Sequence, residues 1–143
     1  MKDLQTLSDE AEIRALTCRY SDCYDRADAE GYGGTFLIDG MLDSSAIGFG
    51  IAIGPEAIAE VVRQVRPQQA HVVHVVTNHL IEVTGPDTAR GSCYYSARSR
   101  LHNGGRGEYV GRYDDMYRRT PDGWRFARRV IVPLLPPDAE GFA

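Results

Sequence analysis

Apolar residues in the first part of the chain recur every three or four positions, a spacing typical of amphipathic helices. Ser8 suits the N-cap of a first helix over residues 9–28, which has an acidic first turn. A second helix, weakened by glycines, is predicted over 29–39, and a third over 54–66 between two prolines. The apolar stripe of the first helix consists of Ile13, Leu16, Thr17, Tyr20, Cys23, Tyr24 and Ala27.

The second half of the chain has the composition of β-strands, with Val, Ile, Thr and Tyr between short turn signals. The predicted strands cover residues 71–84, 88–101, 108–119 and 124–133, after a short strand pair within 41–54. Short connections favour an antiparallel meander. Helices followed by such a sheet predict the α+β class. We therefore expect a cone-shaped barrel, in which a strongly curved antiparallel sheet is closed by three helices around an internal pocket.

Length and composition limit the classes of protein that the chain can represent. Its 143 residues predict a single domain over 1–135 and a loose C-terminal tail over 136–143. A formal net charge of −4 argues against nucleic-acid binding. No apolar run approaches the ~18 residues of a membrane span, and the polar N-terminus lacks a signal sequence, so a cytoplasmic location is expected.

Three of the four histidines, His71, His74 and His79, lie within nine residues of one predicted strand. Side chains alternate along a strand, so His71 and His79 should share one face and His74 the other. His71 and His79 should also lie about 26 Å apart at roughly 3.3 Å per residue. No zinc-type ligand spacing and no glycine-rich nucleotide loop occur in the chain, so neither a metal nor a cofactor is expected.

Four segments, in order, carry a family resemblance: "RYSDCYDRADAEGYGGTFLID", "GPEAI", "HVVTNHLIEV" and "YVGRYDDMYRRTPDGWRFARRVIV". Together they resemble the SnoaL-like branch of the nuclear transport factor 2-like superfamily, which includes scytalone dehydratase and hexachlorocyclohexane dehydrochlorinase. The resemblance covers nearly the whole chain and implies the α+β cone expected above. It also implies a small-molecule substrate or ligand, no membrane partner, and assembly as a homodimer or homotrimer.

Enzymes of this family carry an Asp–His dyad at the cavity. The resemblance places the aspartate at Asp25, late in the first helix, and the histidine at His74. A neutral imidazole held by a carboxylate is a suitable general base near neutral pH. On the helical wheel, however, Asp25 lies roughly 140° from the centre of the apolar stripe, so periodicity alone predicts a solvent-exposed side chain.

Three tyrosines are further candidates. Tyr24 stands where scytalone dehydratase has a tyrosine that helps to bind a catalytic water, so it either polarises a substrate carbonyl or packs in the core. Tyr20, one turn earlier on the same stripe, is expected in the pocket wall or in the core. Tyr113 lies near the position of a pocket amide in scytalone dehydratase, and either lines the pocket or packs across strands.

Two polar residues complete the candidate substrate contacts. Asn78 should share the face of His74, and it either orients that base or satisfies a strand irregularity. Arg128 and Arg129 point to opposite faces of the last strand, so at most one of them reaches the cavity. Arg128 is the candidate for contact with an anionic or carbonyl-bearing substrate.

The chain departs from both named relatives at their other functional positions. A second water-binding tyrosine of scytalone dehydratase falls at Gly40, and its second pocket histidine falls near Ser99. The dehydrochlorinase has a catalytic lysine near Tyr20, whereas Lys2 is the only lysine here. Neither specific chemistry is therefore expected to transfer.

The sequence leaves two classes of function open. The first is a cofactor-independent lyase, dehydratase-like, or an isomerase, which would act through the Asp–His dyad on a small cyclic, polyketide-, steroid- or aromatic-like carbonyl compound. The second is a non-catalytic ligand-binding or assembly domain of the same fold, since a fold does not determine a function. A small subunit of a ring-hydroxylating dioxygenase is a third, related interpretation.

Overall fold

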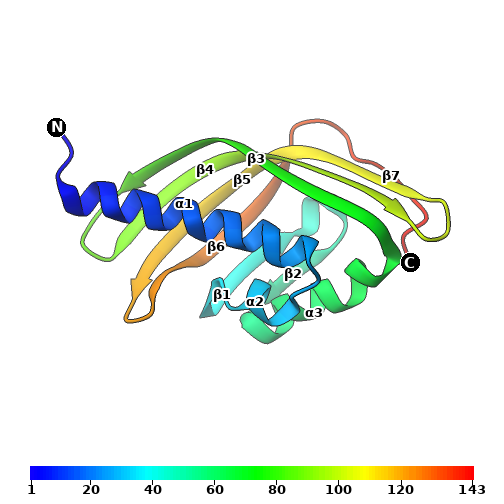
Figure 1. The fold of residues 1–143 in the computed structure, drawn as a ribbon, viewed down its shortest axis with the longest axis horizontal. Coiled ribbons are helices and arrows are strands. Elements are labelled where there is room, and N and C mark those ends of the chain that lie inside the picture. The colour runs from blue at the N-terminus through cyan, green and yellow to red at the C-terminus, as the bar shows by residue number, and fades with distance from the viewer.

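A long helix lies along the concave side of a curved sheet in the computed structural model, which describes residues 1–143 (Figure 1). This helix is α1 (Leu4–Asp25), and the shorter α2 (Ala29–Gly33) and α3 (Pro55–Val65) pack together on the same side at one end. No helix is long and apolar enough to span a membrane. The strands are β1 (Phe36–Ser44), β2 (Gly50–Ile53), β3 (Gln69–Val83), β4 (Thr88–Leu101), β5 (Arg106–Thr120), β6 (Gly123–Pro133) and β7 (Asp138–Glu140).

The seven strands form one sheet in the order β2-β1-β6-β5-β4-β3, with β7 paired to the start of β5. Strands β3 to β6 make the antiparallel meander that short connections predict. Strand β1 runs antiparallel to β2 and parallel to β6. The α+β class and the cone-shaped arrangement are therefore confirmed. The apolar core fills the space between the concave face and the helices.

Three predicted helix boundaries are wrong, one of them the end of the first helix, which lies at Asp25 instead of residue 28. The first helix begins one turn before the predicted cap, because the Asp3 carboxylate accepts a hydrogen bond from the Thr6 backbone N–H at 2.8 Å, which makes Asp3, not Ser8, the N-cap. The second helix ends at Gly33 instead of continuing to residue 39. From Phe36 onward the backbone pairs with β6, and this pairing outweighs the weak helix propensity of the glycine-rich segment.

The last residues are packed on the sheet and are not loose as the sequence suggested. Arg106 at the start of β5 makes ion pairs at 2.8 Å with both Asp138 and Glu140 of β7. Beyond β7, the ring of Phe142 lies edge-on to that of Phe49, with 6.0 Å between the ring centres. Backbone pairing, two ion pairs and an aromatic contact together hold this segment.

A bulge in β3 reverses the alternation of its side chains. The pairing with β4 shifts between Thr77 and Leu80, where Asn78 adopts a left-handed conformation with φ of 53°. His79 therefore turns to the concave face, where it lies 3.1 Å from the Tyr117 hydroxyl. His74 also faces this side, so the prediction that His74 and His79 lie on opposite faces is wrong.

A second irregularity lies in β6. Met116 pairs with Arg128 and Tyr117 pairs with Phe126, which leaves Ala127 as an extra residue in the ladder. Phe126 faces the core before the bulge, and Arg129 faces it afterwards. The bulge thus directs Arg128 to the outer face.

The buried guanidinium of Arg129 is neutralised by Asp115 on β5. Both residues are fully buried at the side chain, and Nε and Nη2 of Arg129 each donate to Asp115 at 2.8 Å. The Tyr117 hydroxyl donates to the same carboxylate at 2.9 Å. The guanidinium also stacks on the rings of Tyr113 and Phe126, 4.0 and 4.1 Å from their centres. This charged cluster joins β5 to β6 inside the core.

Burial lowers the pKa of His79, which predicts a pH dependence of stability. In the unfolded chain this side chain binds a proton near the ordinary histidine pKa of 6.5, whereas the folded protein binds it only at lower pH. The free energy of unfolding should therefore fall as pH drops below 6.5 and stop falling, for this group, below the folded pKa. Urea unfolding at several pH values should show a smaller loss in His79→Gln than in the wild type. Parallel curves for the two proteins would contradict this prediction.

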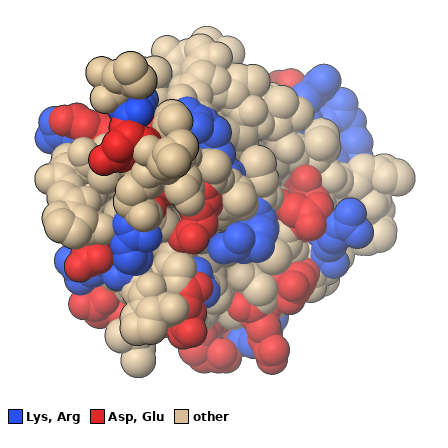
Figure 2. Space-filling model, turned by 60° about the vertical axis from the view of Figure 1, so that its left-hand side comes forward, with Lys and Arg blue, Asp and Glu red and all other residues tan.

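The surface carries mixed charge. On the face in Figure 2, acidic and basic side chains are interspersed with uncharged ones, and no continuous patch of one sign covers it. Exposed ion pairs of the molecule include Arg90 with Glu82 and Arg63 with Glu56. Such pairs contribute little to stability individually.

Candidate active site

A cavity of about 80 Å³ lies between the concave face of the sheet and the helices. Its wall is mostly apolar and aromatic, with contributions from α1, α3, β3, β4 and β5. Phe49 and Phe142, which contact each other, border it as well. A mostly apolar wall with a few polar groups is typical of a small-molecule site, although this cavity is smaller than the roughly 300–1,000 Å³ of most such sites.

The imidazole of His74 and the carboxylate of Asp25 meet at this cavity. Nδ1 of His74 lies 2.7 Å from Oδ1 of Asp25, and the His74 backbone N–H donates to Oδ2 at 3.0 Å. An ionised carboxylate only accepts hydrogen bonds, so the proton of the neutral imidazole is on Nδ1 and Nε2 is free to accept one. His74 lines the cavity, and its side chain is 13% exposed.

Arg66 fixes the end of α1 that carries Asp25. Its Nε and Nη2 donate to the Asp25 backbone carbonyl at 3.1 and 3.0 Å, and its Nη1 donates to the Gln69 carbonyl at 2.7 Å. A cation at a helix C-terminus also interacts favourably with the helix dipole. Asp25 is the last residue of α1, and its side chain reaches beyond the helix to β3. This explains how it meets His74 although it lies far from the apolar stripe.

The candidate tyrosines all line the cavity. Tyr24 donates its hydroxyl proton to Gln69 Oε1 at 2.7 Å, and its ring meets His74 edge-on, 5.0 Å between centres. Tyr32 donates to the hydroxyl of Tyr20 at 2.7 Å, which leaves the Tyr20 proton for another acceptor. Burial raises the pKa of Tyr24, Tyr20 and Tyr113, so all three phenols remain protonated and able to donate.

Asn78 and Arg128 do not lie at the cavity. Asn78 is the exposed left-handed residue of the β3 bulge and is not part of the cavity wall. Arg128 is exposed and borders a groove on the outer face of the sheet, together with Met116 and Asp114. In both cases a bulge, which strict alternation ignores, separates the residue from the expected face.

Several residues that the fold brings to the site were not among the candidates predicted from the sequence. Arg66 contacts the backbone carbonyl of Asp25, and the side-chain amide of Gln69 accepts a hydrogen bond from Tyr24. No sequence pattern predicts either contact. Tyr95 and Ser99 occupy the inward positions of β4, and alternation with the buried Cys93 would have identified that face.

This architecture recurs in known proteins. The family model of the SnoaL-like domain matches residues 5–130. The chain belongs to the SnoaL-like family. Its fold is that of the nuclear transport factor 2-like superfamily. The uncharacterised protein Rv2910c of Mycobacterium tuberculosis is 33% identical over 135 residues, which cover 91% of this chain and 88% of that protein.

Two solved structures illustrate the range of this SnoaL-like fold. A provisionally named aromatic ring hydroxylase of Novosphingobium aromaticivorans is 27% identical, with a TM-score of 0.88 and 94% of each chain covered. Hexachlorocyclohexane dehydrochlorinase LinA-type3 of Novosphingobium barchaimii is 19% identical, with a TM-score of 0.84 and coverage of 99% of this chain and 97% of that one. The second likeness shows the fold alone.

Proposed function

We propose that this SnoaL-like protein is a cofactor-independent lyase or isomerase that uses general acid/base catalysis on a small carbonyl compound. The observation that supports this most directly is the contact of 2.7 Å between His74 and Asp25 at the wall of a mostly apolar cavity. A base with one free nitrogen in such a cavity can remove a proton from carbon without competition from bulk water.

In the proposed reaction, Nε2 of His74 accepts a proton from the carbon next to the carbonyl group. The C–H electron pair moves into the C–C bond, and the carbonyl oxygen gains negative charge. The hydroxyls of Tyr20 and Tyr113 stabilise this oxygen by donating hydrogen bonds. A β-leaving group then departs, which completes an elimination, or the proton returns at a different carbon, which completes an isomerisation.

Asp25 and Tyr24 position the base in this scheme. Asp25 holds the proton on Nδ1 and stabilises the imidazolium that forms. Tyr24 contacts the imidazole ring but donates its own proton to Gln69, so it is better placed to fix His74 than to bind a substrate oxygen.

Exchange of α-protons for deuterium tests the function without knowledge of the natural substrate. Ketones such as 2-tetralone and 3′-hydroxyacetophenone would be incubated with the protein in D2O and followed by proton NMR. We expect the wild-type protein to accelerate exchange over the rate in buffer alone for ketones that fit the cavity. Exchange at the buffer rate across the whole ketone panel would contradict the proposal.

Similarity to the provisionally named aromatic ring hydroxylase favours a second candidate, an accessory subunit of an oxygenase. Such a subunit would bind the catalytic subunit through its surface and would need no catalytic base in its cavity. Stable co-purification with a larger iron–sulfur protein, combined with an exchange rate that is insensitive to His74, would support this alternative.

The outer face of the sheet supports assembly into a homodimer or homotrimer. Exposed apolar side chains gather there, namely Val73, Val75, Leu80, Tyr94, Val110 and Met116. Light scattering of the wild type should give a mass above that of one chain, and Val75→Lys should lower it by placing a charge in the patch. Ile38→Lys, at a more exposed apolar position on β1, should leave the mass unchanged. A monomeric wild type would contradict this proposal.

A further inference from the structure

Two hydroxyl groups on the inner face of β4 have no hydrogen-bond partner in the protein. They belong to Tyr95 and Ser99, which are 4% and 3% exposed and both line the cavity. A buried hydroxyl without a partner is unfavourable for folding. Hydroxyl groups that reduce the stability of the folded protein and belong to residues of a cavity wall are candidates for contact with a ligand.

Glycines on the neighbouring strand β5 make room for both side chains. The Tyr95 ring lies across Gly111, where a Cβ atom would come within 2.8 Å of Cε1 and 3.0 Å of the hydroxyl. The same ring stacks on Tyr113, with 4.4 Å between centres and 7° between planes. At Gly107, a Cβ atom would lie 2.9 Å from Ser99 Oγ. The sheet thus leaves room for both hydroxyls, and the stacking on Tyr113 orients the Tyr95 ring.

The two residues that carry these hydroxyls flank the proposed base along the sheet. Ala97 of β4 pairs directly with His74 of β3, and Tyr95 and Ser99 are the inward residues two positions before and after Ala97. A ligand that reaches His74 can therefore meet one hydroxyl on each side. Each hydroxyl is at once a donor and an acceptor, so carbonyl and hydroxyl oxygens both match it.

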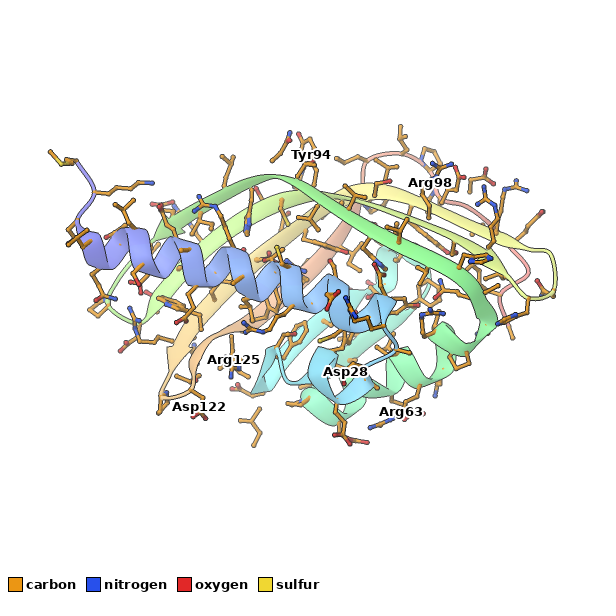
Figure 3. All side chains as sticks on the ribbon, viewed as in Figure 1. Asp28, Arg63, Tyr94, Arg98, Asp122 and Arg125 are labelled. Carbon is orange, nitrogen blue, oxygen red and sulfur yellow. The ribbon has the colours of Figure 1, made fainter.

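The arginines near the cavity already have protein partners, and Arg66 donates to the backbone carbonyls of Asp25 and Gln69. Arg129 is paired with Asp115, and Arg98, at the border of the cavity, lies 3.3 Å from Glu108. The side chain of Arg98 is 62% exposed and extends from the outer side of the sheet (Figure 3). A carboxylate or phosphate inside the cavity would thus lack a partner charge, which disfavours an anionic ligand.

We propose that Tyr95 and Ser99 bind two separate oxygen atoms of one uncharged ligand, so that the substrate carries at least two carbonyl or hydroxyl groups placed on either side of the His74 imidazole. This inference rests on the proposed function, and it narrows the substrate to neutral compounds with two oxygen functions.

Calorimetric binding of three related probes tests the proposal: 3′-hydroxyacetophenone, acetophenone and 3-hydroxybenzoate. The wild type should bind the first, which is neutral and has two oxygens, more tightly than the other two. Tyr95→Phe and Ser99→Ala should each weaken its binding by roughly three- to tenfold, the value of one hydrogen bond. The variant that loses the partner of the phenolic oxygen should also reduce the preference over acetophenone, whereas the variant that loses the partner of the carbonyl oxygen should weaken the binding of both ketones.

The matched controls are Tyr94→Phe and Ser96→Ala, which remove the same groups from outward positions of the same strand. Tyr94 extends from the outer side of the sheet (Figure 3). Both control proteins should bind the probes as the wild type does. The thermal midpoints of Tyr95→Phe and Ser99→Ala should equal or exceed that of the wild type, because each removes an unpaired buried hydroxyl. A structural role would instead lower the midpoint.

Three results would overturn the proposal: wild-type affinity in both Tyr95→Phe and Ser99→Ala, tighter binding of 3-hydroxybenzoate than of the neutral probes, or no binding of 3′-hydroxyacetophenone. Binding needs no proton transfer, so the same measurements can be made on His74→Gln. Hydroxyl-dependent binding in a protein without His74-dependent exchange would contradict the proposed function alone. His74-dependent exchange without hydroxyl-dependent binding would contradict only the present inference.

Discussion

Replacement of His74 by glutamine should lower the rate of α-proton exchange by about 10²–10⁴-fold, the usual contribution of a positioned general base. The amide N–H of glutamine can donate to the Asp25 carboxylate as the imidazole does, but glutamine is far too weak a base to remove the proton. The measurement is the initial exchange rate in D2O for a ketone that the wild type processes. The folded state of the variant would be checked by its thermal midpoint.

Two control proteins make this result specific. His71→Gln changes an exposed histidine of the same strand and should retain the wild-type rate. Asp25→Asn should also be slow, because an amide can donate to Nδ1 and so favour the tautomer whose Nε2 carries the proton. Asp22→Asn, one turn earlier on α1 and exposed, should retain activity. Wild-type rates in both His74→Gln and Asp25→Asn would rule out the proposed base.

Replacement of Asp115 by alanine should lower the free energy of unfolding by about 3–5 kcal/mol, because the fully buried Arg129 would lose its counter-charge. Tyr117 would lose its acceptor as well. Urea denaturation measures this loss. Asp114→Ala, which removes an adjacent carboxylate that pairs with Arg112 on the outer face, should cost only about 0–1 kcal/mol.

A double replacement separates the charge from the packing. In Asp115→Leu combined with Arg129→Met, no buried charge remains unpaired, so much of the stability lost in Asp115→Ala should return. Equal losses in Asp115→Ala and Asp114→Ala would show that the buried pair does not hold β5 to β6.

The regular elements were predictable because each depends on short-range patterns. The three- and four-residue spacing on α1 and the turn signals between β3, β4, β5 and β6 are local properties of the chain, and they led to the observed elements. The prediction failed at residues 34–39, where local propensity is weak. There, pairing of Phe36 with Phe126, 90 residues later, selects a strand.

The candidate site was only partly accessible from the sequence. The family resemblance led to Asp25 and His74, although periodicity had placed Asp25 in solvent. Arg66 holds the end of α1 by contacts with backbone carbonyls, and a backbone acceptor leaves no residue-specific trace in the sequence. Sequence patterns therefore indicated which side chains could react but not what positions them.

The sequence by itself determined the α+β class, the order of the elements and the residue types available for chemistry, since these follow from periodicity and composition. The tertiary structure decided which side chains face the cavity. The bulges near Asn78 and Ala127 each add one residue to a strand, and one extra residue turns every later side chain to the other face. For this reason His79 and Arg129 lie on the concave side of the sheet and Arg128 lies on its outer side. A bulge forms only where neighbouring strands pair, so the tertiary structure was needed to locate both.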